Sequence, residues 1–311
     1  LLCGGCEVAV RKVIFTTGLG NKDVFRIGET VCTLPEAKVY LCNYQNIYGS
    51  VYGLNLWEQA SSKKQLDSYV KEMTISELAR ITCMDQLAEE QDISLSEEEQ
   101  KKAAEAAKAY FSSLSKDEIA YMDVTEETIE TLYQNYALAD KLYATLTEGV
   151  NEEVSDDEAR IIHAMQIVVK DKENADAVTA RLAAGEDFTS LASDYNDGQD
   201  IEVTFGRGDV PEEVEKVAFS MEDGEVSPCI ETDQGYYFIK CVNKYDEELT
   251  QENKVKIAQE REKTAFNDAY DAFVKEQDSM LNEKLWDETK IVTDGSITTN
   301  SFFAVYAQYC K

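Results

Sequence analysis

Histidine is nearly absent from this sequence, since His163 carries the single imidazole among 311 residues. Imidazole is the side chain that most often binds metals or moves protons near neutral pH. One histidine supports no Ser-His-Asp arrangement beyond coincidence. Cys3 and Cys6 form a CxxC pair, but neither a second pair nor a nearby histidine completes a zinc site. No P-loop or dinucleotide-binding fingerprint occurs. We therefore expect no metal and no cofactor.

Basic residues are also scarce. The chain has 30 lysines and arginines against 61 acidic residues, a formal net charge of −31. A nucleic-acid partner needs a basic surface that replaces phosphate counterions, so we expect no nucleic-acid binding. The three prolines exclude a proline-rich linker. No run of about 18 apolar residues is present that would span a membrane. With 43% hydrophobic residues, the chain can still form a packed core.

The first six residues, LLCGGC, resemble the end of a bacterial lipoprotein signal, in which apolar and small residues precede a cysteine that becomes acylated. In this interpretation Cys6 carries the lipid and residues 7–23 are a polar tether, so residues 1–23 form the lipoprotein N-terminus and tether. The pattern is imperfect, because Cys3 stands where such signals usually have leucine. The alternative is an ordinary turn of small residues.

Helical signals dominate residues 24–152. The stretch VFRIGETV predicts two short strands joined by a turn, after which Thr33 caps a helix with Pro35 in its first turn. Three further helices are expected: one over 65–92, one after a capping box of Ser96 and Glu99, and one after Thr125.

Residues 153–246 change to a mixed pattern after the acidic stretch GVNEEVSDDEAR. RIIHAMQIVV predicts a buried strand that contains His163. Three short helices follow: one ends at Gly185, one is capped by Asp187, and one has Pro211 near its first turn. EVSPCIETDQGYYFIKCV predicts a hairpin with TDQG as its turn. A disulfide between Cys229 and Cys241, on the two arms of this hairpin, is conceivable.

Residues 247–311 return to a helical pattern, with a long charged helix first. The tail is expected to form a strand at KIVTD, residues 290–294, followed by an irregular end.

The middle segment resembles the parvulin family of peptidyl-prolyl cis-trans isomerases. Four blocks stand in the family's order over roughly residues 155–245: RIIHAMQIVV, LAAGEDFTSLASDYND, FGRGDVPEEVEKVAF and GEVSPCIETDQGYYFIK. The flanks are similar to those of PrsA-like and SurA-like secreted foldases. The resemblance implies an α+β fold in which a parvulin-like module, a small antiparallel sheet with surrounding helices, is inserted between two helical segments that together form a chaperone domain. KIVTD would then supply a strand that pairs with the first strand of that domain.

The resemblance also implies site residues. Parvulins hold the proline ring in an apolar pocket beside a network of two histidines, an acid or thiol, and a hydroxyl. Val210 and Val214 stand where methionine and phenylalanine are common, which predicts a wider, shallower pocket. The residues that match these positions are His163, Asp197, Thr232 and Tyr237 for the network, and Val210, Val214 and Phe219 for the pocket.

Two departures from the parvulin pattern leave the activity open. Tyr237 replaces the second histidine, and the glycine block expected before Arg207 reads GQDIEVTFGRG. A tyrosine hydroxyl can still hydrogen-bond His163, so the network is altered rather than necessarily lost. Rotation about an X–Pro bond crosses a barrier of roughly 18–20 kcal/mol without making a bond, so an enzyme needs only to bind the twisted amide best.

Three functions therefore stand at this point. The first is an isomerase and chaperone for unfolded, proline-containing exported proteins, lipid-anchored on the extracytoplasmic face of a bacterial membrane, with relatives that can form homodimers. The second is a non-catalytic chaperone or binding lipoprotein with a degenerate parvulin scaffold. The third, an adhesin, rests on the RGD tripeptide at 207–209, which the parvulin pattern already explains.

Overall fold

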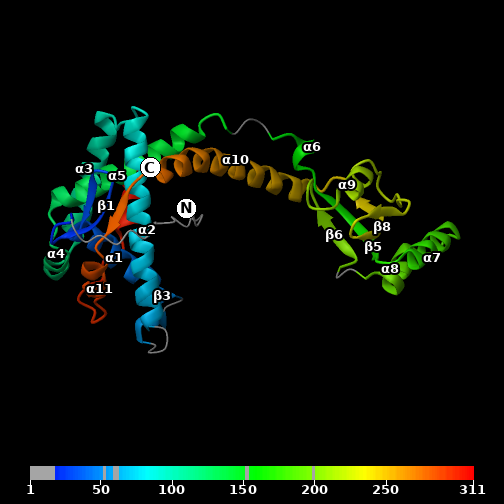
Figure 1. Ribbon diagram of the computed structural model, residues 1–311, viewed down its shortest axis with the longest axis horizontal. Coiled ribbons are helices and arrows are strands. Elements are labelled where there is room, and N and C mark those ends of the chain that lie inside the picture. The colour runs from blue at the N-terminus through cyan, green and yellow to red at the C-terminus, as the bar shows by residue number, and fades with distance from the viewer. Residues whose placement is uncertain (1–17, 52–53, 59–62, 151–153, 198–199) are drawn as a thin grey trace. The chain divides into compact units, whose positions relative to one another are not determined.

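The computed structural model describes residues 18–51, 54–58, 63–150, 154–197 and 200–311. Cys6, the expected acylation position, lies outside this part of the chain. The chain folds into two compact units, Leu1–Glu148 with Phe266–Lys311 and Gly149–Ala265. We call them the helical unit and the middle unit (Figure 1). Both contain small antiparallel sheets with helices around them, so the predicted α+β fold is confirmed.

The helical unit starts with a hairpin followed by helices and is completed by the C-terminal part of the chain, from Phe266 onward. Its elements are β1 (Asp23–Ile27), β2 (Thr30–Thr33), α1 (Leu34–Tyr48), β3 (Ser50–Val51), β4 (Leu54–Asn55), the 3-10 turn Leu56–Glu58, α2 (Lys63–Glu90), α3 (Glu97–Ser113), α4 (Lys116–Met122), α5 (Glu126–Thr147), β9 (Ser279–Leu281), α11 (Glu283–Glu288) and α12 (Phe302–Cys310).

Local capping determines where these helices begin. The Glu36 carboxylate accepts a hydrogen bond from the Thr33 backbone N–H at 2.6 Å. The Ser96 Oγ accepts from the Glu99 N–H at 3.3 Å, and Thr125 Oγ1 accepts from the Thr128 N–H at 3.2 Å. Such side chains satisfy backbone donors that have no partner inside the helix. The predicted helix starts at 34, 97 and 126 are therefore confirmed.

The C-terminal segment is held in the helical unit by buried polar side chains. Asn43 donates from Nδ2 to the Tyr110 hydroxyl at 2.7 Å and accepts from the Phe302 N–H at 3.0 Å. Glu118, which is 3% exposed, accepts from the N–H groups of Thr298 and Thr299 at 2.8 Å each. Buried polar groups are stable only when they are paired in this way.

The predicted strand at residues 290–294 is wrong. The strand that pairs with β1 from the C-terminal side is β9, with Phe25 opposite Leu281 and Ile27 opposite Ser279. Because β2 occupies the other side of β1, both edges of β1 are filled and none remains for KIVTD. Ile291 and Val292 instead pack against the helical core.

The expected irregular end is also wrong, because residues 302–310 form α12. Phe302 and Tyr306, four residues apart on one helix face, are both buried in the helical core.

The middle unit is a four-stranded antiparallel sheet in the order β6-β5-β8-β7 with short helices on both faces. The predicted hairpin is confirmed, with Thr232 opposite Gly235 across the turn. Its elements are α6 (Asp156–Ala159), β5 (Ile162–Val169), α7 (Lys172–Ala183), α8 (Phe188–Tyr195), β6 (Glu202–Phe205), α9 (Glu212–Ala218), β7 (Ile230–Thr232) and β8 (Gly235–Asn243), followed by α10 (Glu247–Lys275).

The first part of α10 folds with the middle unit, although the sequence placed everything after residue 246 in the chaperone domain. The Thr250 hydroxyl accepts from the Ile161 N–H at 3.1 Å, and Asn253 donates to the Ala159 carbonyl oxygen at 2.9 Å. These bonds join α10 to the segment that leads into β5. The middle unit therefore extends to Ala265.

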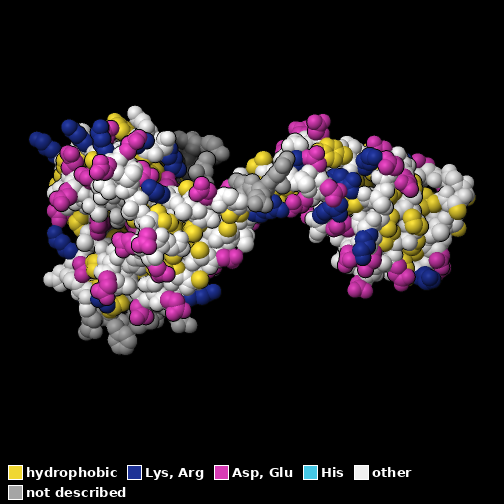
Figure 2. Space-filling view, turned by 90° about the horizontal axis from the view of Figure 1, so that it is seen from above, with side chains coloured by type: hydrophobic (Ala, Val, Ile, Leu, Met, Phe, Trp, Pro, Cys, Tyr) yellow, Lys and Arg dark blue, Asp and Glu magenta, His cyan; other side chains and the backbone are white. Residues whose placement is uncertain are grey.

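Acidic side chains are spread over the visible surface of both units rather than gathered in one patch (Figure 2). Within the ranges that the structure describes, no helix is both long enough and apolar enough to cross a membrane.

Candidate functional site on the α9 face of the sheet

Alternation along β5 and β8 divides the middle unit into two cores. Ile162 and Ala164 of β5 pack with Ile239 and Cys241 of β8 against α9; we call this side of the sheet the α9 face. The opposite side, which packs against α7 and α8, is the α7–α8 face, and Ile167 lies there. Successive side chains of a strand point to opposite faces. Even-numbered residues of β5 therefore belong to the α9 face and odd-numbered residues to the α7–α8 face.

His163 does not join the other expected site residues. Its odd position places it on the α7–α8 face, and its strand neighbours are Thr204 and Asn243. Tyr237 lies opposite Val168, five residues further along β5. At about 3.4 Å per residue this separates the two positions by about 17 Å. The hydrogen bond between His163 and the Tyr237 hydroxyl that the sequence allowed is therefore not formed.

Gln166, three residues after His163 on β5, lies on the sheet face where the network histidine was expected. Its even number puts it on the α9 face, half-buried, opposite Ile239 and diagonal to Tyr237. Diagonal neighbours in a sheet are about 7–8 Å apart, within reach of long side chains. Its Nε2 donates to the Asp200 carbonyl oxygen at 2.9 Å. The sequence IIHAMQIVV gives no alternation that could have identified it, because this strand carries apolar side chains on both faces.

Tyr237 and Thr232 belong to the β7–β8 hairpin. The Tyr237 hydroxyl donates to Gln234 Oε1 at 3.4 Å. The Thr232 hydroxyl donates to the Gly235 carbonyl oxygen at 2.9 Å and accepts from the Gln234 N–H at 3.1 Å. Gly235 has φ +135°, and a Cβ there would lie 2.7 Å from the Val169 carbonyl oxygen. The turn therefore requires glycine, and it places Tyr237 beside the end of β5.

Asp197 lies on the other side of the same part of β5. Its backbone N–H donates to the Val168 carbonyl oxygen at 2.7 Å, and its carboxylate accepts from the Lys170 N–H at 3.3 Å. Val168 is thus flanked by Asp197 and by Tyr237. Two strand spacings of about 4.8 Å separate these two backbones. Asp197, Gln166 and Tyr237 accordingly surround one end of β5.

The three expected pocket residues share the α9-face core but differ in exposure. Val210 and Phe219 are half-buried and pack against the core that contains Val214. Val214 itself is 0% exposed, so it forms the base of this core and no part of its surface. Val203 of β6 is a half-buried apolar side chain that sequence reasoning missed.

The conceivable Cys229–Cys241 disulfide is not formed. Both are free thiols, and they pack on opposite sides of the sheet, Cys229 with the α7–α8 core and Cys241 with the α9 core. Burial raises the pKa of each thiol, which disfavours the reactive thiolate. No group of three metal-ligating side chains is found in the described ranges.

Comparison with known proteins finds a family match that overlaps the middle unit. The family model of the PPIC-type PPIase domain matches residues 124–256. The foldase protein PrsA of Caldanaerobacter subterraneus subsp. tengcongensis is 27% identical over 240 residues, which cover 68% of this chain and 73% of that relative. The PrsA of Clostridium acetobutylicum is 26% identical over 304 residues, 88% of each chain.

Solved structures of PrsA proteins are also similar to this chain. The peptidylprolyl isomerase PrsA from Bacillus cereus shares 21% sequence identity, with a TM-score of 0.36, over 85% of this chain and 99% of that one. Residues 124–256 thus match the PPIC-type PPIase domain, and the chain is similar over most of its length to PrsA foldases.

Proposed function

We propose that this protein is an extracytoplasmic folding factor that binds unfolded, proline-containing exported chains and isomerises their X–Pro bonds on the α9 face. Its kinship with PrsA foldases supports the general role. One observation supports the location of the site. The half-buried apolar side chains of Val203 and Val210 lie on the same sheet face as the polar side chains of Gln166 and Tyr237.

The chemistry requires only noncovalent contacts. Val203 and Val210 supply an apolar surface for a proline ring, and withdrawal of water disfavours the charge-separated planar amide. The Tyr237 hydroxyl and the Gln166 amide supply hydrogen-bonding groups at the edge of that surface. Groups that bind the twisted amide better than either planar isomer lower the barrier. No histidine is needed in this arrangement, because no proton has to be transferred.

The proposal predicts that the purified protein accelerates proline-limited refolding of a client and suppresses its aggregation. The rate constant of the slow refolding phase and light scattering at equal client concentration measure the two effects. Acceleration that falls severalfold in Tyr237→Phe, a variant that loses only the hydroxyl, would support isomerisation at this face. Suppression without acceleration would make the protein a chaperone with a non-catalytic parvulin unit. If the protein neither accelerated refolding nor suppressed aggregation, the result would contradict the proposed function.

The proposal includes a lipid anchor at Cys6, which the LLCGGC motif supports. In a bacterial host that acylates lipoproteins, we expect mass spectrometry of the mature N-terminus to find a thioether-linked diacylglycerol on Cys6. Cys6→Ala should move the protein from the membrane fraction to the soluble fraction, because the lipid supplies the membrane affinity. Cys3→Ala is the matched control and should keep the lipid. An unmodified Cys6 in membrane-bound protein would contradict the anchor.

A further inference from the structure

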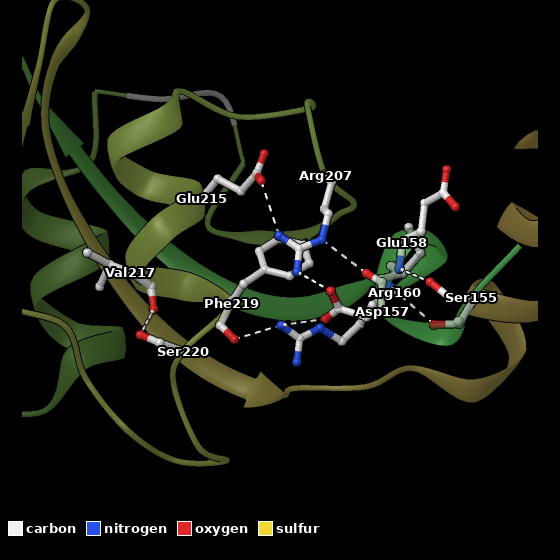
Figure 3. Close-up of polar contacts among 11 residues, drawn as sticks. Ser155, Asp157, Glu158, Arg160, Arg207, Glu215, Val217, Phe219 and Ser220 are labelled. Carbon is white, nitrogen blue, oxygen red and sulfur yellow. Dashed lines mark hydrogen bonds and ion pairs between the residues drawn. The ribbon is translucent and has the colours of Figure 1, made fainter.

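The ring of Phe219 packs against two arginines from other parts of the middle unit (Figure 3). The Cζ atoms of Arg160 and Arg207 lie 4.7 and 4.5 Å from the ring centroid. Arg160 also donates from Nη2 to the Phe219 carbonyl oxygen at 2.6 Å. A guanidinium over an aromatic ring is attracted by the negative charge of the ring face. The two arginines therefore fix where this ring lies beside the α9-face core.

Asp157 of α6 binds both arginines with one carboxylate. Its Oδ2 accepts from Arg207 Nη2 at 2.7 Å, and its Oδ1 lies 3.8 Å from Arg160 Nη2. Its backbone oxygen accepts a further hydrogen bond from Arg207 Nε at 3.0 Å. Two like charges close to one ring repel each other, and an anion that contacts both offsets this repulsion. Asp157 is the counter-ion that they share.

Arg207 also connects this cluster to the loop that carries Val210. Glu215 of α9 accepts from Arg207 Nη1 at 3.3 Å and from the Gly208 N–H at 2.8 Å. The loop over residues 206–210 is thus held from α9 on one side and from α6 on the other. Val210, at its end, packs on the α9-face core. The position of Arg207 therefore affects where the side chains of Phe219 and Val210 lie.

We propose that Asp157 is a positioning residue for the peptide-binding surface: by holding Arg160 and Arg207 over Phe219, it fixes the ring and the 206–210 loop that borders the α9 face. Asp157 acts through the arginines and touches no substrate. Its side chain is 71% exposed, so its replacement should leave the fold intact. This inference deepens the proposed function and rests on it.

The test compares Asp157→Asn with Asp156→Asn in the full chain. The two variants change the same charge on adjacent residues of α6, but Asp156 pairs with Lys254 and not with the arginines at Phe219. Protein labelled with 4-fluorophenylalanine gives a ¹⁹F resonance for Phe219, assigned by its loss in Phe219→Leu. A fluorescent Ala-Ala-Pro-Phe peptide gives Kd by anisotropy, and the isomerisation assay gives KM and kcat.

We expect Asp157→Asn to shift or broaden the Phe219 resonance and to raise KM and the peptide Kd about three- to tenfold, with kcat changed by less than about twofold. Asp156→Asn should match the wild type in each measurement. Asp157→Glu, which keeps the charge, should recover part of the binding. A merely structural role would change the urea unfolding midpoint and not the ratio of KM to kcat.

Two results would overturn the inference. One is a Phe219 resonance that is unchanged in Asp157→Asn, and the other is a changed resonance with unchanged peptide binding. Failure of the proposed function has a different signature, because the wild type itself would then neither bind the peptide nor accelerate isomerisation.

Discussion

Asn43→Ala is expected to lower the free energy of unfolding of the helical unit by about 3 kcal/mol, through loss of buried hydrogen bonds and the cavity that remains. Asn43 is 0% exposed, and its Nδ2 donates to the Val39 carbonyl oxygen at 2.8 Å as well as to Tyr110. Its Oδ1 accepts from the Phe302 N–H. The substitution leaves that buried N–H without its partner, so it loosens α12 as well as α1.

Urea unfolding followed by tryptophan fluorescence measures this effect. The two tryptophans of the chain, Trp57 and Trp286, both pack in the helical unit, so their emission reports on that unit. Asn174→Ala is the control, since Asn174 is an exposed residue of α7 in the middle unit. A free energy for Asn43→Ala within about 0.5 kcal/mol of the wild type would show that the buried network adds nothing to stability.

Gln166→Ala is expected to lower kcat/KM for peptidyl-prolyl isomerisation about tenfold, or about 1.4 kcal/mol of transition-state stabilisation. The reason is its place on the α9 face, diagonal to Tyr237, where its amide can contact a bound peptide. Gln166→Glu preserves the shape of the side chain and tests whether the neutral amide is required.

His163→Ala is the matched control for this effect. His163 lies three residues away on the same strand, equally half-buried, but on the α7–α8 face. We expect its kcat/KM to stay within about twofold of the wild type. Loss of activity in His163→Ala with full activity in Gln166→Ala would place the reaction on the other face of the sheet and contradict the proposed site.

The parvulin-type segment was predictable because its signals are local. The Asp187 carboxylate accepts from the Ser190 N–H three residues away at 2.9 Å, and Gly185, just after α7, has φ +84°. The hairpin turn depends on Gly235, which follows Thr232 by three residues. Each of these features depends on neighbours along the chain, so the local sequence predicts it.

The site was only partly predictable. Alternation along β5 decides which side chains share a sheet face, and the register with β8 decides which residues lie opposite each other. His163 and Gln166 are three residues apart, and an odd shift along a strand moves a side chain to the opposite face. Recognition of a histidine before aliphatic residues could not correct this. The register with β8, which puts Val168 opposite Tyr237, then decided which of the two lies near the hairpin.

By itself, the sequence determined the α+β class, most helix and strand segments, the hairpin and the parvulin-type order, since those depend on contacts within a few residues. The tertiary structure alone decided that β9 completes the first sheet, that α10 begins in the middle unit, and that Gln166 rather than His163 lies on the same sheet face as Tyr237. It also brought Asp157 to Arg207, fifty positions later. Such contacts between distant segments depend on how whole elements pack, which no local pattern of residues encodes.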